Sequence, residues 1–124
     1  MKNKKLLIMI TLLLLLAGTN CFAQNTAALQ KALQGTWNLI SIMENESITA
    51  ESYFKENKVT IQFIVSGSGY SMKYPNKTDT GTFTISPGYI MITNSEYNEK
   101  MPYIIEGKIL ILFSDNSALV FRKK

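Results

Sequence analysis

Gly35-Thr36-Trp37 lies between a short helix-like segment and a series of strand-like runs that Gly, Pro, Asn and Asp separate. The tryptophan stands where the first strand of a small antiparallel barrel would cross the barrel floor. Runs of this length with short turns between them pair with their neighbours along the chain. The sequence therefore predicts an all-β fold, an eight-stranded antiparallel up-and-down barrel with a short N-terminal helix.

The segment before this stretch, Asn25 to Gln34, has the pattern of that helix. Asn25 or Thr26 can cap its start, and a glycine follows its end. Leu29 and Leu33 lie four residues apart and therefore share one face. A helix this short is not stable alone in water, so we expect that face to dock on the barrel end beneath Trp37.

The strand pattern after the glycine recurs eight times, with apolar and polar residues alternating. In the first run, the alternation places Trp37, Leu39 and Met43 on one face. A two-sheet sandwich is the alternative to a barrel, but it usually needs long cross-connections, and none is present after Asn57. Closure into a barrel also removes unpaired edges. The predicted strands are Trp37 to Met43, Val59 to Val65, Tyr70 to Tyr74, Thr80 to Ser86, Tyr89 to Thr93, Met101 to Glu106, Lys108 to Phe113 and Ser117 to Arg122.

Glu44 to Asn57 is the longest connection between two predicted strands. It contains a short helix-like stretch that Thr49 can cap, with Tyr53 and Phe54 as its bulky apolar residues. Connections of this length often cover a site. Two interpretations stay open: a loop pinned by the two aromatic residues, or a lid that moves.

Residues 1–23 have the pattern of an export signal. Three lysines precede an apolar run from Leu6 to Ala17, which is too short to span a membrane. Cys21-Phe22-Ala23 predicts cleavage after Ala23, which leaves one domain, residues 24–124, in the periplasm or outside the cell. A lipoprotein anchored through Cys21 is the alternative, although Asn20 stands where that signal prefers Gly, Ala or Ser.

Charge and composition exclude several function classes. The chain has thirteen basic and nine acidic residues, and three basic residues precede the predicted cleavage point, so the net charge falls from +4 to +1. With no run of five or more like charges, the sequence does not predict binding to nucleic acid. The exported part has no histidine, no cysteine and no clustered acids for acid–base, nucleophilic or metal chemistry. We therefore predict a protein without catalytic activity, metal or cofactor.

Five stretches carry a likeness to a known family. They are Leu33-Gln34-Gly35-Thr36-Trp37-Asn38-Leu39, Gly69-Tyr70-Ser71-Met72, Gly81-Thr82-Phe83-Thr84-Ile85, Tyr103-Ile104-Ile105-Glu106-Gly107-Lys108-Ile109-Leu110-Ile111-Leu112 and Leu119-Val120-Phe121-Arg122. With this pattern the chain resembles a bacterial lipocalin-like domain, a small β-barrel of the calycin type. The resemblance implies that Trp37 packs beneath Arg122 at the closed end, a cation–π pair that contributes about 0.5–2 kcal/mol. It also implies a small apolar ligand held in the cup.

Side chains with a large apolar body suit the lining of such a cup, and a tyrosine adds a polar hydroxyl. The same side chains also suit ordinary barrel packing, so that interpretation stays open. We expect the mouth near the connection between the first two predicted strands. The candidate ligand-binding residues are Tyr53, Phe54, Tyr70, Met72, Tyr89 and Tyr103.

Ile109 to Phe113 is apolar on both faces, and Ile90 to Ile92 and Ile104-Ile105 share this property. A strand with one solvated face should be polar on that face. The terminal helix, a second copy of the chain or a client protein must therefore cover it. This predicts the alternative function, a periplasmic protein-interaction module, either an enzyme inhibitor or an assembly accessory, without a ligand cavity. A pocket lined by Tyr and Met would favour a ligand, and a filled interior would favour the interaction module.

Overall fold

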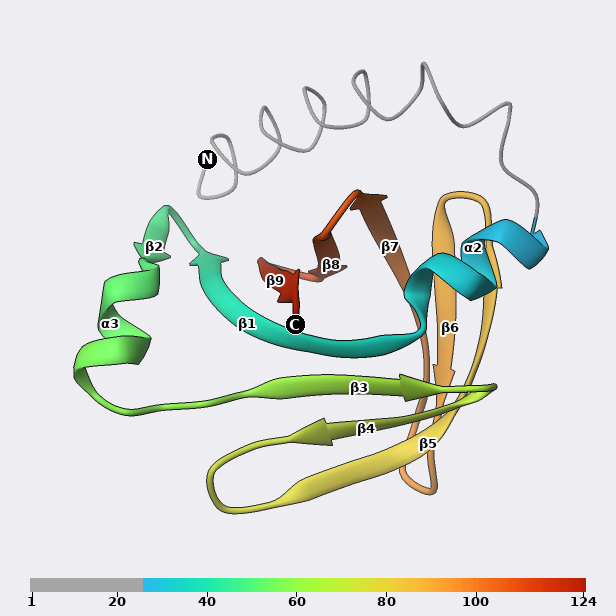
Figure 1. Cartoon of the computed structure of the whole chain (residues 1–124), viewed down its shortest axis with the longest axis horizontal. Helices are drawn as coiled ribbons and strands as arrows, with labels where there is room; N and C mark the ends of the chain where they lie inside the picture. The colour runs from blue at the N-terminus through green and yellow to red at the C-terminus, as the bar shows by residue number, and fades with distance from the viewer. Residues whose placement is uncertain (1–25) are drawn as a thin grey trace.

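The computed structural model describes residues 26–124. The predicted export signal, its cleavage point and Cys21 lie outside the described residues. The described part contains two helices and nine strands (Figure 1). They are α2 (Thr26–Leu33), β1 (Gly35–Glu44), β2 (Ser47–Thr49), α3 (Glu51–Glu56), β3 (Gln62–Ser66), β4 (Gly69–Lys73), β5 (Thr78–Ser86), β6 (Tyr89–Thr93), β7 (Asn98–Glu106), β8 (Ile109–Ser114) and β9 (Ser117–Lys123).

Eight of these strands close into an antiparallel barrel, which confirms the predicted fold. From β3 to β9, each strand pairs with its neighbour in the sequence. β1 closes the ring because it pairs with β3 on one side and with β9 on the other. The pairing with β9 runs from Trp37 opposite Lys123 to Glu44 opposite Ser117. β2 was not predicted, and it extends the sheet beyond the ring by pairing with the end of β1.

Strand limits agree best with the prediction where turn residues directly flank the apolar run. β6 spans Tyr89–Thr93 as predicted. β7 begins at Asn98, three residues before the predicted start, because its backbone pairing with β6 continues to Thr93 opposite Asn98. Ladder hydrogen bonds depend on the backbone, so polar side chains at a strand end do not prevent them.

The barrel interior is filled by side chains. Trp37, Phe63, Leu110, Leu112 and Phe121 are all fully buried. They belong to one core cluster, and Leu29 and Leu33 of α2 join it, as expected for a helix that docks on the barrel end. An eight-stranded barrel has room for its own side chains or for one small ligand, and here core side chains occupy the interior.

Gly81 on β5 shows how tightly this interior is packed. It lies opposite Tyr70 of β4, whose ring is buried. A Cβ atom at Gly81 would lie 2.2 Å from the carbonyl oxygen of Thr93 and 2.8 Å from the Tyr70 ring. Only glycine leaves space for both the neighbouring backbone and the tyrosine.

A β-bulge in β1 changes which residues face inward. The register between β1 and β9 shifts between Leu39 and Ser41, where Ile40 is the additional residue. An extra residue exchanges the two faces of the strand beyond it. Ile42 therefore packs against the main core, and Met43 packs in a second cluster. The prediction that Met43 shares a face with Trp37 was wrong.

The second cluster lies on the outer face of β7, β8 and β9. Its buried members are Ile104, Ile111, Phe113 and Ala118. They alternate with inward residues such as Leu110 and Leu112, so both faces of these strands carry apolar side chains. The buried leucines of α2 join the main core and not this cluster.

Trp37 closes the barrel floor, but its cationic neighbour is Lys123 and not Arg122. The Lys123 ammonium lies 5.2 Å from the centre of the Trp37 ring, and it donates a hydrogen bond to the carbonyl of Ala32 at 3.1 Å. The indole N–H donates to the carbonyl of Leu33 at 2.8 Å. Both donors satisfy carbonyls at the end of α2, which lack partners within the helix. The predicted contact was wrong because alternation along β9 turns Arg122 outward.

Candidate functional site

The barrel wall opens between β1 and β3. The two strands pair only as far as Asn38 opposite Gln62, with one further hydrogen bond from Leu39 N–H to the carbonyl of Ile61. Beyond this point β1 turns toward β2, and β3 is preceded by the segment that leaves α3. In Figure 1, α3 lies at this end of β1, and α2 lies at the opposite end. The gap thus lies next to the connection between the first two predicted strands, near which the mouth of the barrel was expected.

A hollow of about 430 Å³ occupies this gap. Its apolar part includes Leu39 and Phe54, which are both 7% exposed, and Ile61. Its rim carries charged side chains from α3 and from Lys58, two residues after the helix. The complete lining is Asn38, Leu39, Ile40, Glu51, Phe54, Lys55, Lys58, Val59, Thr60 and Ile61.

The end of α3 forms one edge of this hollow and has the hydrogen bonds of a Schellman motif. Val59 N–H donates to the carbonyl of Phe54 at 2.9 Å, and Lys58 N–H donates to that of Lys55 at 3.3 Å. Lys58 has a φ of 54°, in the left-handed region where helix ends usually carry glycine. At the start of the helix, Ala50 is the N-cap without a side-chain hydrogen bond, so the predicted cap by Thr49 was wrong.

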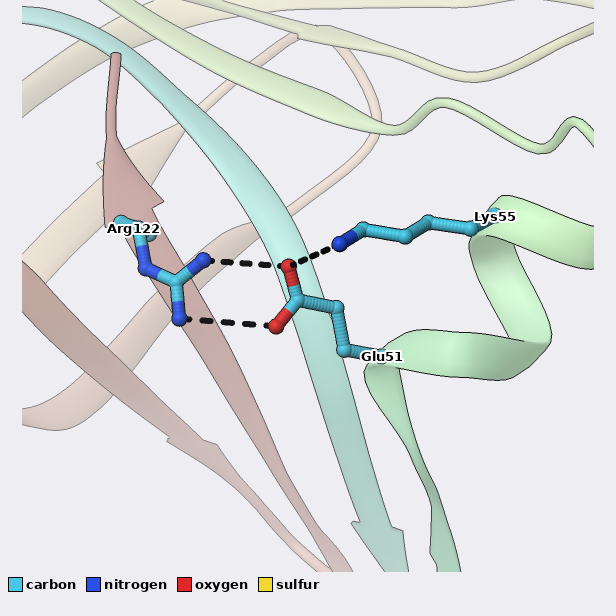
Figure 2. A network of polar contacts seen from close by, with 3 residues as sticks. All are labelled: Glu51, Lys55 and Arg122. Atoms are coloured by element: carbon cyan, nitrogen blue, oxygen red, sulfur yellow. Dashed lines mark hydrogen bonds and ion pairs between the residues drawn. The ribbon is translucent and has the colours of Figure 1, made fainter.

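Glu51 connects α3 to the last strand of the barrel (Figure 2). Its carboxylate accepts hydrogen bonds from the two terminal nitrogens of Arg122, at 3.0 and 3.4 Å. Lys55 lies 3.6 Å from the same carboxylate. The hydrogen bond from Arg122 and the charges of both cations hold the pKa of Glu51 below its ordinary value of 4.5. Arg122 therefore links β9 to α3 across the outer face of β1, where Figure 2 shows the three side chains.

Of the six predicted ligand-binding residues, only Phe54 lines this hollow. It also belongs to the main core, whereas Tyr53 beside it is 51% exposed. The rings of these two residues meet edge to face at 5.7 Å.

The other four predicted residues lie on β4, β6 and β7 and do not gather around the hollow. Tyr70 is buried against Phe63, its hydroxyl meets Asn94 at 3.4 Å, and burial raises its pKa. Met72 packs against the core. Tyr89 lies beneath the Lys100 ammonium, and buried Tyr103 donates its hydroxyl hydrogen to a backbone carbonyl.

Sequence patterns did not indicate most of the lining. Val59 and Ile61 were assigned to a regular strand, but they precede β3 and border the gap. Leu39 and Ile40 also line the hollow although they are neighbours in β1, because the bulge interrupts the alternation there. The positive φ of Lys58 has no signal in its residue type. One signal was available: an unusually long connection often borders a site.

A model of the lipocalin-like domain family matches residues 33–110. The chain belongs to the lipocalin-like family. The match begins at Leu33, includes Trp37 and extends to Leu110 of β8, so it covers most of the closed ring. Comparison with curated proteins gives no match, and comparison with solved structures gives none either.

The lipocalin-like barrel is a binding-protein fold. Among residues 26–124, no three His, Cys, Asp or Glu side chains gather closely enough to hold a metal ion. In the same range, no helix has the length and apolar character needed to cross a membrane. The chemical character of the candidate site is thus an apolar hollow with charged side chains at its rim.

Proposed function

We propose that this lipocalin-like protein is exported and binds a small apolar ligand without catalysing a reaction. The observation that carries the proposal is the hollow between α3 and the barrel wall, where Leu39, Phe54 and Ile61 form an apolar lining. Its volume of about 430 Å³ falls in the range of small-molecule sites, roughly 300–1,000 Å³. We place the site in the wall and not in the central cup, because the hollow is lined by wall residues and the core cluster occupies the barrel interior.

Native mass spectrometry tests whether the protein carries a ligand. The protein is purified after export from the expression host, and intact mass reports whether cleavage occurred after Ala23. Spectra are recorded before and after extraction with organic solvent. Loss of a defined small mass supports a bound ligand.

A neutral fluorescent probe, N-phenyl-1-naphthylamine, tests the location of the site. Thr60 lines the hollow and is exposed, so Thr60→Trp fills the space without a change in the core. Thr84 is an exposed threonine on β5, and Thr84→Trp is the matched control. The proposal expects weaker probe binding in Thr60→Trp alone. Equal binding by both variants contradicts a site in the hollow.

A second candidate function, a protein-interaction module, is supported by the exposed edge of the outer apolar face, whose central residues are buried. Cross-strand partners continue this face from Phe113 through Ala118 and Met43 to Ile48. Ile48 is 67% exposed. The filled interior also favours this function over a central cup. Sedimentation velocity of the exported protein and of Ile48→Ser tests self-association through this face. The hypothesis expects a dimer that forms as the concentration rises and that the substitution weakens.

A further inference from the structure

The rim of the hollow carries more positive than negative charge. Of its ten lining residues, Lys55 and Lys58 are basic and Glu51 is the single acid. Both oxygens of that acid accept hydrogen bonds from Arg122. Lys55 also contacts this carboxylate at 3.6 Å, whereas Lys58 lies on the same rim without an ion pair among the described residues. Arg122, Lys55 and Lys58 thus bring three positive charges near a rim with one acid, an excess of two beside an apolar surface.

Lys58 is held at this rim by an unfavourable backbone conformation. Its φ of 54° costs a residue with a Cβ atom more than it costs glycine, and glycine is the common residue at this position of a Schellman motif. Within residues 26–124, no salt bridge holds the Lys58 ammonium. A strained residue at a site is an observation from which function can be inferred. A lysine occupies a position where glycine would fit the backbone better, and its ammonium is available to a ligand.

We propose that the hollow selects a small molecule that has one anionic group, a carboxylate or a sulfonate, on a compact apolar body. The body contacts Leu39, Phe54 and Ile61, and the anionic group lies between Lys55 and Lys58. This inference rests on the proposed function and names the ligand class for the same site. An ammonium is a strongly hydrated point charge on a flexible stem, so two exposed lysines select for charge and not for one exact geometry.

Two probes that share an aromatic body separate the charge from the apolar contact. 1-Anilinonaphthalene-8-sulfonate has a sulfonate, and N-phenyl-1-naphthylamine lacks it. The exported protein is titrated with each probe, as are Lys55→Gln/Lys58→Gln and a matched control, Lys73→Gln/Lys108→Gln. The control removes two exposed lysines that do not line the hollow. Circular dichroism confirms that all three proteins are folded.

The proposal expects the Lys55→Gln/Lys58→Gln variant to bind the sulfonate probe roughly 2- to 30-fold more weakly, which is the range for the loss of two exposed ion pairs. Its affinity for the neutral probe should not change. An increase in salt from about 0.05 M to about 0.5 M should weaken only the sulfonate probe. The control should match the wild-type protein with both probes.

Three results overturn this inference, and they differ in what they mean for the proposed function. If both probes bind and neither responds to the two lysines, the hollow binds apolar molecules without selection for an anion, and the proposed function stands. If neither probe binds the wild-type protein, the hollow is not a ligand site, and both proposals fail. If the control variant loses affinity for the sulfonate probe by the same factor, the inference is also overturned, because the effect then arises from net charge.

Discussion

Lys58→Gly should stabilise the protein and weaken its binding of anions. A non-glycine residue in the left-handed region costs about 1–2 kcal/mol relative to its preferred conformation. Glycine avoids this cost but loses about 0.5–1 kcal/mol more conformational entropy on folding. With φ at 54°, the expected net gain in the free energy of unfolding is about 0.5–1 kcal/mol. The two hydrogen bonds that end α3 involve backbone atoms, so the substitution keeps them.

Urea denaturation measures this gain, and thermal denaturation should show a rise in Tm of about 2–8 °C for a domain of this size. Lys58→Ala is the first control because it removes the same ammonium but keeps a Cβ atom, and therefore keeps the cost of the left-handed backbone. It should be no more stable than the wild-type protein. Glu46→Gly is the second control, since Glu46 has a φ of 75° in the turn between β1 and β2 and does not line the hollow. It should gain similar stability without a change in probe binding.

Equal stabilities for Lys58→Gly and Lys58→Ala would refute the reasoning, because the gain must come from the left-handed backbone. The predicted loss of anion binding is tested separately from the gain in stability. If Lys58→Gly is more stable and still binds the sulfonate probe as tightly as the wild-type protein, then ligand binding does not explain why lysine occupies this position.

Three further predictions concern the barrel and its link to α3. Gly81→Ala should lower the free energy of unfolding by about 1–3 kcal/mol in urea denaturation, because its Cβ atom would meet a backbone oxygen of β6 at 2.2 Å. Gly69→Ala is the control, since its nearest contacts are 3.6 Å away, and equal losses in both variants would contradict the packing argument. Glu51 has a lowered pKa in the folded protein, so the stability that it contributes is complete above pH 4.5 and is lost as pH falls through the folded pKa. NMR titration should show that this pKa rises in Arg122→Gln, and an unchanged pKa would refute the assigned cause. Trp37→Phe removes a buried indole N–H that donates to the end of α2, so it should cost about 2 kcal/mol or more in urea denaturation, and wild-type stability would contradict that role.

The structure also suggests why α3 is important to the candidate site. Phe54 anchors the helix in the core, and Glu51 ties it to Arg122 of β9. The helix thus has two attachments: an apolar one through Phe54 and an electrostatic one through Glu51. Since the ion pair is exposed, we expect the apolar attachment to contribute most of the stability. The interpretation of this segment as a loop pinned by aromatic residues agrees with buried Phe54, while exposed Tyr53 contributes only an edge-to-face contact.

Local patterns were sufficient to predict the order of the barrel strands. Alternation and turn residues identified runs that overlap all eight barrel strands, and β6 matched at both ends. β2 was missed because three residues are too few for a periodic signal. The inward face of β1 could not be predicted beyond Leu39, because the bulge at Ile40 has no characteristic residue type. A single extra residue exchanges the two faces of a strand, so a small local feature moved Ile42 inward and Met43 outward.

The cation that contacts Trp37 at the barrel floor is a second feature that local patterns could not predict. Both Arg122 and Lys123 are basic, so composition does not distinguish them. The register decides: Lys123 lies opposite Trp37, and Arg122 lies opposite Asn38, which faces outward. One position along the strand separates a contact with the indole from an ion pair with α3.

Hydrophobic periodicity and turn chemistry are local properties, so the amino-acid pattern was enough to predict the family, the eight barrel strands and the helix that docks on their end. The position of the proposed binding hollow depends instead on contacts that form only in the folded chain. The hollow exists because β1 leaves β3 after Asn38 and α3 lies beside the gap, and it brings together Leu39, Phe54 and Ile61 from three separate segments. Contacts between distant segments depend on register and on the path of the chain, which no local pattern contains.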